Sequence, residues 1–122
     1  MKRLLLIGEH DKGLGTPFHP STLSGRRLRE MEREVGAHFV FENMLAPGLS
    51  TSRVSADAQI GHVEHLLTVA KTVDAVVLLG ARVQRDMAPV FPDGVMLPHP
   101  GARRPEDLRR LRDGLLALVV KP

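Results

Sequence analysis

The chain has 122 residues and contains no cysteine. Disulfide bridges, zinc sites with thiolate ligands, iron–sulfur clusters held by cysteine and a cysteine nucleophile are therefore excluded. Long apolar runs are absent too, because segments such as Leu4 to Ile7 and Ala75 to Leu79 are far shorter than the ~20 residues of a membrane-spanning helix. Charge returns at Glu9, too early for a signal peptide. We expect a soluble, cytoplasmic protein with no membrane partner.

The composition is that of a globular protein with a slight excess of positive charge. Hydrophobic residues make up 43% and charged residues 25% of the chain, which argues against disorder, and the length suits one domain spanning residues 1–122. Lysine and arginine number 17 against 14 acidic residues, and most of these cations are arginine, which forms forked contacts with phosphate. This bias permits nucleic-acid binding, although a GC-rich genome would produce the same bias.

Four short segments have the residue pattern of strands, and four others have that of helices. The strands are expected at residues 4–7, 38–42, 74–79 and 94–97. The helices are expected at residues 22–35, after a cap at Ser55, at residues 81–87 and from Pro105 onward. Strand and helix alternate along the chain, which predicts an open α/β sheet with right-handed crossovers.

The helical spacing of apolar residues predicts the buried face of each longer helix. These faces comprise Leu28, Met31 and Val35 in the first helix; Ile60, Val63, Leu67 and Ala70, widened by Leu66, in the second; and Leu108, Leu111, Leu115 and Leu118 in the last.

Ligands of open α/β sheets bind outside the carboxyl ends of the strands, and this chain places polar residues there. Glu9 follows the first strand and can orient water or stabilise a cation, while Phe18, framed by Pro17, can stack on a flat ring. The alternative is that Glu9 is a solvated loop acid and Phe18 a lid over the core. Both residues lie in a long loop, the kind of segment that often carries function.

Two further candidates follow later strands. His99 lies between two prolines, which would pre-place its imidazole to donate a hydrogen bond to a substrate oxygen. Asn43 follows the second strand, and its amide can hydrogen-bond the edge of a nucleobase. Alternatively, each belongs to an ordinary turn.

Two arginine pairs lie near these candidates in the sequence. Arg26 and Arg27 open the first long helix, and Arg103 and Arg104 follow His99. Arginine pairs of this kind can contact phosphate groups.

The motifs taken together, in this order and over nearly the whole chain, resemble the uracil-DNA glycosylase superfamily. The resemblance rests on a strand followed by Gly8-Glu9, the loop Gly15-Thr16-Pro17-Phe18, a strand ending in Asn43, the segment Val76 to Ala81, and Pro98-His99-Pro100. It is closest to the compact, cysteine-free branches. It implies a three-layer αβα domain whose four-stranded parallel sheet has the order 2-1-3-4.

The resemblance also implies a function and a set of site residues. The protein would bind an extruded, damaged or modified base and hydrolyse its N-glycosidic bond. Gly8, Phe18 and Asn43 would bind the base, Glu9 would position water, and His99 would stabilise negative charge on the departing base. No cofactor or metal is needed, and we expect a monomer. The partners would be DNA and the base in the pocket, with the DNA backbone faced by Arg26, Arg27, Arg103 and Arg104.

Two other functions remain open. The chain has His10-Asp11-Lys12 after Glu9 and Gly101 after His-Pro, where the compact branches have Ala-Pro-Gly and serine, which favours a phage-type relative that binds or helps modify bases without excising them. His10, Asp11 and His19 can also form the metal site of a nucleotide hydrolase.

One other pair of residues could share a metal. His62 and His65 are three residues apart on one helix face, although a solvated face is the simpler interpretation.

Overall fold

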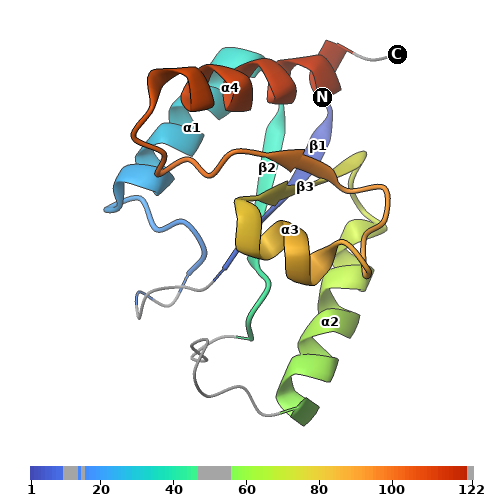
Figure 1. Cartoon of the computed structure of the whole chain (residues 1–122). Helices are drawn as coiled ribbons and strands as arrows, with labels where there is room; N and C mark the ends of the chain where they lie inside the picture. The colour runs from blue at the N-terminus through green and yellow to red at the C-terminus, as the bar shows by residue number, and fades with distance from the viewer. Residues whose placement is uncertain (10–13, 15, 47–55, 121–122) are drawn as a thin grey trace.

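The computed structural model describes residues 1–9, 14, 16–46 and 56–120, which form an α/β fold around a parallel sheet (Figure 1). The strands are β1 (Arg3–Gly8), β2 (His38–Asn43), β3 (Ala75–Leu79) and β4 (Val95–Leu97). They pair in the order β2-β1-β3-β4, and every pairing is parallel. The expected α/β class and strand order are therefore confirmed. The strands that were expected lie within a residue or two of the observed bounds.

Helices cover both faces of the sheet (Figure 1). Their bounds are α1 (Leu23–Val35), α2 (Ala56–Ala70), α3 (Ala81–Met87) and α4 (Pro105–Val120). Leu4 and Leu6 of β1 pack with α1 and α4, whereas Leu5 and Ile7 pack with α2 and α3. Because successive side chains of a strand point to opposite faces, β1 supplies both cores at once, which explains its unbroken apolar run.

The first helix follows its sequence signals. The Thr22 hydroxyl accepts a hydrogen bond from the Gly25 amide at 3.0 Å and caps the start of α1. Gly36 ends the helix with a φ of +71°, a left-handed conformation that favours glycine. The predicted apolar face is buried: Leu28, Met31 and Val35.

The buried face predicted for α2 is wrong in two of its main positions. Ile60 is 61% exposed and Leu67 is 40% exposed, whereas Leu66 is fully buried. Val69 and Ala70 pack against the same core as Leu66. The helix is thus rotated about its axis relative to the expectation. Its expected cap, Ser55, lies outside the described residues.

Polar side chains explain this rotation. Gln59 donates from Nε2 to the carbonyl oxygen of Met44 at 2.6 Å. His62 donates from Nε2 to the carbonyl oxygen of Asn43 at 2.6 Å. These carbonyls lie where β2 ends, and the helix turns polar side chains inward to donate to them.

The last helix agrees with its sequence pattern. Pro105 is its first residue, and Glu106 and Asp107 lie in its first turn, where carboxylates favour the helix dipole. Leu111 and Leu115 are fully buried. Within the described part of the chain, no helix combines the length and apolar character needed to cross a membrane.

Candidate functional site

A cavity of about 370 Å³ lies at the carboxyl ends of the strands. Among the described residues that line it are Glu9 after β1, Phe18 in the following loop, Asn43 at the end of β2 and His99 after β4. The expectation that these four residues converge on one pocket is confirmed. Their expected roles in base binding and catalysis are taken up below as a proposal.

Gly8 lets the Phe18 ring lie directly on the end of β1. A Cβ atom at position 8 would lie 2.5 Å from Cζ of Phe18 and 3.3 Å from Oδ1 of Asn43. Any larger residue would push both side chains away. Gly8 is therefore required for the close approach of the two residues expected to contact a base.

Phe18 adopts an unusual backbone conformation. Its φ is +48°, which is rare for a residue other than glycine and costs free energy unless the surroundings hold it. Arg29 of α1 donates from Nη1 to the Phe18 carbonyl oxygen at 2.7 Å. A Cβ atom at Gly25 would lie 2.5 Å from that oxygen. The loop is thus pressed against the first turn of α1 and held there.

The Phe18 ring lies near two other rings. Its centroid is 5.7 Å from that of Phe41 and 6.3 Å from that of His99, and both pairs are tilted. The Arg29 guanidinium lies 5.1 Å from the Phe41 centroid. Contacts of this kind fix the orientation of Phe18 and leave the ring as one wall of the cavity.

His99 has a defined tautomer. Its Nδ1 accepts a hydrogen bond from the Gly101 amide at 2.9 Å. A neutral imidazole has one acceptor and one donor nitrogen, so this bond leaves the proton on Nε2. A Cβ atom at Gly101 would lie 3.0 Å from Nδ1, which explains why glycine suits this position.

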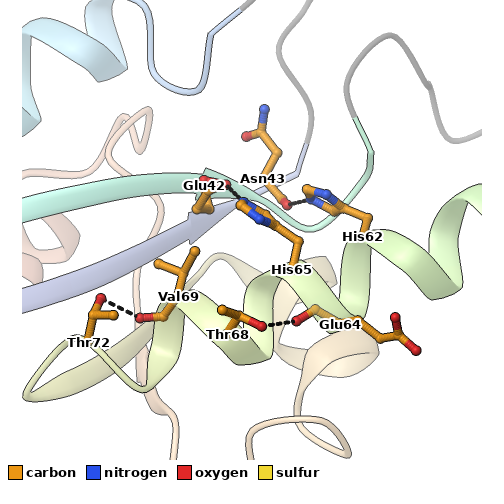
Figure 2. A network of polar contacts seen from close by, with 8 residues as sticks. All are labelled: Glu42, Asn43, His62, Glu64, His65, Thr68, Val69 and Thr72. Carbon is orange, nitrogen blue, oxygen red and sulfur yellow. Dashed lines mark hydrogen bonds and ion pairs between the residues drawn. The ribbon is translucent and has the colours of Figure 1, made fainter.

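Asn43 is a buried polar residue whose main chain and side chain face different ways. The residue is 8% exposed and lines the cavity. The main-chain carbonyl oxygen of Asn43 accepts a hydrogen bond from His62, while the side-chain amide points away from α2 (Figure 2). The backbone of Asn43 is therefore anchored to α2, which leaves the amide directed to the cavity side of the strand end.

Sequence reasoning missed one charged residue of the cavity. Arg82 is the second residue of α3, and its Nη1 lies 3.2 Å from Oε1 of Glu9. Its Nε lies 3.6 Å from Oδ2 of Asp86. A hydrogen bond from Arg85, together with the charges of Arg85 and Arg82, holds the pKa of Asp86 below its ordinary value. The position of Arg82 three residues after the end of β3 was the available signal.

Three other polar residues line the cavity and were not expected there: His19, Thr22 and Ser24. The Thr22 hydroxyl is used by the α1 cap. His19 accepts at Nδ1 from the hydroxyl of Ser21 at 2.8 Å and from its amide at 3.1 Å. Ser24 is buried, and it follows the cap in the sequence, so only the packing of the loops on α1 brings it to the cavity.

The four arginines expected at a DNA backbone differ in their surroundings. Arg103 is exposed, and Arg104 forms an exposed ion pair with Glu106 at 2.7 Å. Arg26 is exposed and donates to the carbonyl oxygen of Ser21 at 2.9 Å. Arg27 is half-buried and binds the loop after His99, so it differs from the other three.

The histidine pair of α2 lies beside the end of β2 (Figure 2), with His62 half-buried and His65 exposed to solvent. His62 and His65 stack with centroids 5.6 Å apart. The Nε2 atom of His62 binds the Asn43 carbonyl, and that of His65 binds Oε1 of Glu42 at 2.8 Å. Both rings therefore attach α2 to β2.

The described residues include no cluster of three or more side chains suited to a metal ion. Of the three residues considered for a hydrolase metal site, His10 and Asp11 lie outside the described residues, and His19 is bonded to Ser21.

Comparison of the chain with family models, curated protein sequences and solved structures finds no match. The case for a function therefore rests on the cavity itself.

Proposed function

We propose that this protein is a uracil-DNA glycosylase-like enzyme that binds an extruded base in the cavity and hydrolyses its N-glycosidic bond. The observation that carries the proposal is the convergence of Glu9, Phe18, Asn43 and His99 on one cavity of about 370 Å³. These residues supply a ring for stacking, an amide for the base edge, a hydrogen-bond donor and a carboxylate. A flipped-out base needs such a pocket for recognition and chemistry.

Base binding would use the two residues that lie over Gly8. The Phe18 ring stacks on the flat face of the base, and the Asn43 amide hydrogen-bonds its edge. The close approach of both side chains to Gly8 supports this assignment. Thr22 and Ser24 line the same cavity and make part of its wall polar.

Bond cleavage would use His99 and Glu9. The bond between the base nitrogen and C1′ breaks, its electron pair moves onto the base, and the Nε2–H of His99 donates to the base oxygen on which charge develops. Water adds to C1′, and Glu9 accepts a proton from that water. The proton then passes to the departing base, so charge and atoms balance. Support comes from the Gly101 hydrogen bond, which leaves the His99 proton on Nε2.

DNA contact outside the cavity would use exposed cations. Arg26 at the start of α1 and Arg103 and Arg104 beyond His99 are exposed to solvent. Such side chains neutralise phosphates and release counterions, so we expect the affinity for DNA to fall with salt. Each removed phosphate contact should reduce the slope of log affinity against log salt by about one unit.

The test is an excision assay on oligonucleotides that carry uracil, hypoxanthine, xanthine or hydroxymethyluracil, with alkali to cleave abasic sites. We expect strand cleavage at one or more of these bases in single- or double-stranded substrate. Folded protein that neither binds nor cleaves any of the oligonucleotides would contradict the proposal.

A second candidate function keeps the pocket and omits excision. The observation that favours it is the 3.2 Å contact between Glu9 and Arg82, because the guanidinium lies at Oε1, an oxygen that would otherwise accept the proton of water. In this case the protein recognises a modified base, and one oligonucleotide of the panel binds without forming an abasic site. Substitution of His99 would then weaken affinity, with no turnover to lose.

A further inference from the structure

The guanidinium of Arg27 lies against the loop that carries His99. Its Nη1 donates to the carbonyl oxygen of Pro100 at 2.9 Å and to that of Ala102 at 3.0 Å. These bonds join residues 73 and 75 positions apart in the sequence. They attach the first turns of α1 to the segment after β4. Arg27 therefore connects two segments far apart in the sequence, whereas its neighbour Arg26 bonds to Ser21 close by.

One of these bonds involves the same peptide group that contacts the His99 ring. The peptide between Pro100 and Gly101 accepts from Arg27 through its oxygen and donates to Nδ1 of His99 through its N–H. A peptide group is planar, so fixing its oxygen also fixes the direction of its N–H. The guanidinium charge polarises the peptide as well, and hydrogen bonds linked in this way strengthen one another.

Glycine at position 101 makes this restraint necessary. Glycine permits backbone conformations that other residues avoid, so the peptide before it can rotate at little cost. Rotation would withdraw the N–H from Nδ1, and this hydrogen bond would no longer hold the proton of His99 on Nε2. A larger residue is unsuitable here because its Cβ would lie 3.0 Å from Nδ1. The Ala102 amide closes the turn by donating to the His99 carbonyl oxygen at 3.0 Å, and Arg27 adds a restraint on the peptide group inside this turn.

We propose that Arg27 is a positioning residue that sets the tautomer of His99 through the Pro100–Gly101 peptide group. Its consequence for catalysis rests on the proposed function, in which the Nε2–H of His99 donates to the departing base. The tautomer itself does not depend on that function. Arg27 accordingly acts on the cavity and not on a phosphate.

The direct test is nitrogen NMR of protein labelled in histidine and glycine, with Arg27→Ala, Arg27→Lys and a control. In the wild type we expect His99 to be protonated at Nε2 alone, with a coupling across the hydrogen bond between its Nδ1 and the Gly101 nitrogen. Arg27→Ala should give mixed tautomers and no coupling. Arg27→Lys, which keeps one charged donor, should restore part of the wild-type signal. Arg33→Ala, an exposed arginine of the same helix, should change neither.

Further measurements complete the test: the coupling in the wild-type protein, and the kinetics and salt dependence of the Arg27→Ala variant. If Arg27→Ala does not fold, absence of the coupling in the wild type would still overturn the proposal. If the protein excises a base, Arg27→Ala should lower kcat about tenfold with little change in KM, the lower end of what loss of an outer-shell partner costs at metal sites. The salt slope of DNA binding should stay unchanged in this variant, whereas a phosphate contact would reduce it by about one unit.

The two proposals fail separately. An Arg27→Ala protein with an unchanged His99 tautomer overturns the positioning role, whatever the excision assay gives. A panel of oligonucleotides that is neither bound nor cleaved overturns the glycosylase proposal and leaves the nitrogen spectra to decide the role of Arg27.

Discussion

The helices α1 and α2 meet the same end of the sheet from opposite faces, and they use their polar residues differently. In α1 the buried face is apolar, and Arg27 and Arg29 reach sideways to the carbonyls of the two loops that carry His99 and Phe18. In α2 the polar residues turn inward, where Gln59 and His62 bind the chain around the end of β2.

These two sets of polar contacts show that each helix restrains a different part of the cavity. The α1 side restrains two rings through long, charged side chains that reach across loops. The α2 side restrains the backbone of Asn43 through a histidine, and in doing so leaves Ile60 and Leu67 exposed. Apolar periodicity therefore identifies the buried face of α1 and fails for α2.

The largest effect should come from the pair Leu66 and Leu67, adjacent leucines on different faces of α2. Leu66 is fully buried and Leu67 is 40% exposed. Leu66→Ala should lower the free energy of unfolding by about 2–5 kcal/mol, because it leaves a cavity in a packed core. Leu67→Ala should cost within about 0.5 kcal/mol, as for ordinary surface substitutions. Chemical denaturation measures both, and equal losses would show that α2 buries the face that its periodicity predicts.

A second pair compares the histidines that meet the strand ends, His99 in the cavity and His62 behind Asn43. If the proposed excision occurs, His99→Ala should lower its rate about 10²–10³-fold with nearly unchanged affinity, the scale of a lost oxyanion donor. His62→Ala should instead lower the free energy of unfolding by about 1–3 kcal/mol, because the Asn43 carbonyl loses its donor. Rates from single-turnover assays and unfolding curves separate the two effects.

In the same assay, Glu9→Gln tests the role of the carboxylate next to Arg82. Its rate should fall while binding to the substrate persists, because glutamine cannot accept the proton of water. Wild-type rates for both His99→Ala and Glu9→Gln would contradict the proposed chemistry.

The sequence was sufficient to predict the parallel sheet, the buried face of α1 and the convergence of the four site residues. These depend on local patterns and on the rule that strand ends of a parallel sheet lie together. The orientation of α2 was not predictable, because the partners of Gln59 and His62 are main-chain carbonyls whose position depends on where β2 ends.

Other features of the cavity were also beyond the sequence. The positive φ of Phe18 could not be predicted from the sequence. It is held by the hydrogen bond from Arg29 to the Phe18 carbonyl oxygen, and these two residues are 11 positions apart, one in a loop and one in a helix. The pairing of Arg82 with Glu9 joins the ends of β1 and β3, so it depends on strand order.

A smaller effect, of opposite sign for the two helices, is expected at their glycines. A Cβ atom at Gly25 of α1 would lie 2.5 Å from the Phe18 carbonyl oxygen, whereas at Gly61 of α2 it would meet nothing within 4 Å. Gly25→Ala should therefore destabilise the protein by about 1–3 kcal/mol, the usual cost of overpacking. Gly61→Ala should stabilise it by about 0.5–1 kcal/mol, because alanine is the better helix former. Thermal unfolding gives both signs, and a stable Gly25→Ala protein would show that the Phe18 loop can move away from α1.

The smallest effect concerns Asp86 of α3, which lies on the same face of the sheet as α2 and whose pKa is lowered by its bonds and charge contacts with Arg85 and Arg82. A carboxyl whose folded pKa is depressed stabilises the fold above its unfolded pKa, and this contribution is lost as the pH falls through the folded value. Asp86→Asn should therefore reduce stability slightly at neutral pH, by less than about 1 kcal/mol because the pair is largely exposed. The difference from wild type should begin to shrink near pH 4, where the unfolded aspartate becomes protonated, and should disappear once the pH is below the lower folded pKa. Unfolding by urea between pH 3 and pH 7 measures this trend, since the two proteins should converge in acid. A difference that persists at the lowest pH would mean that Asp86 acts through packing and not through its charge.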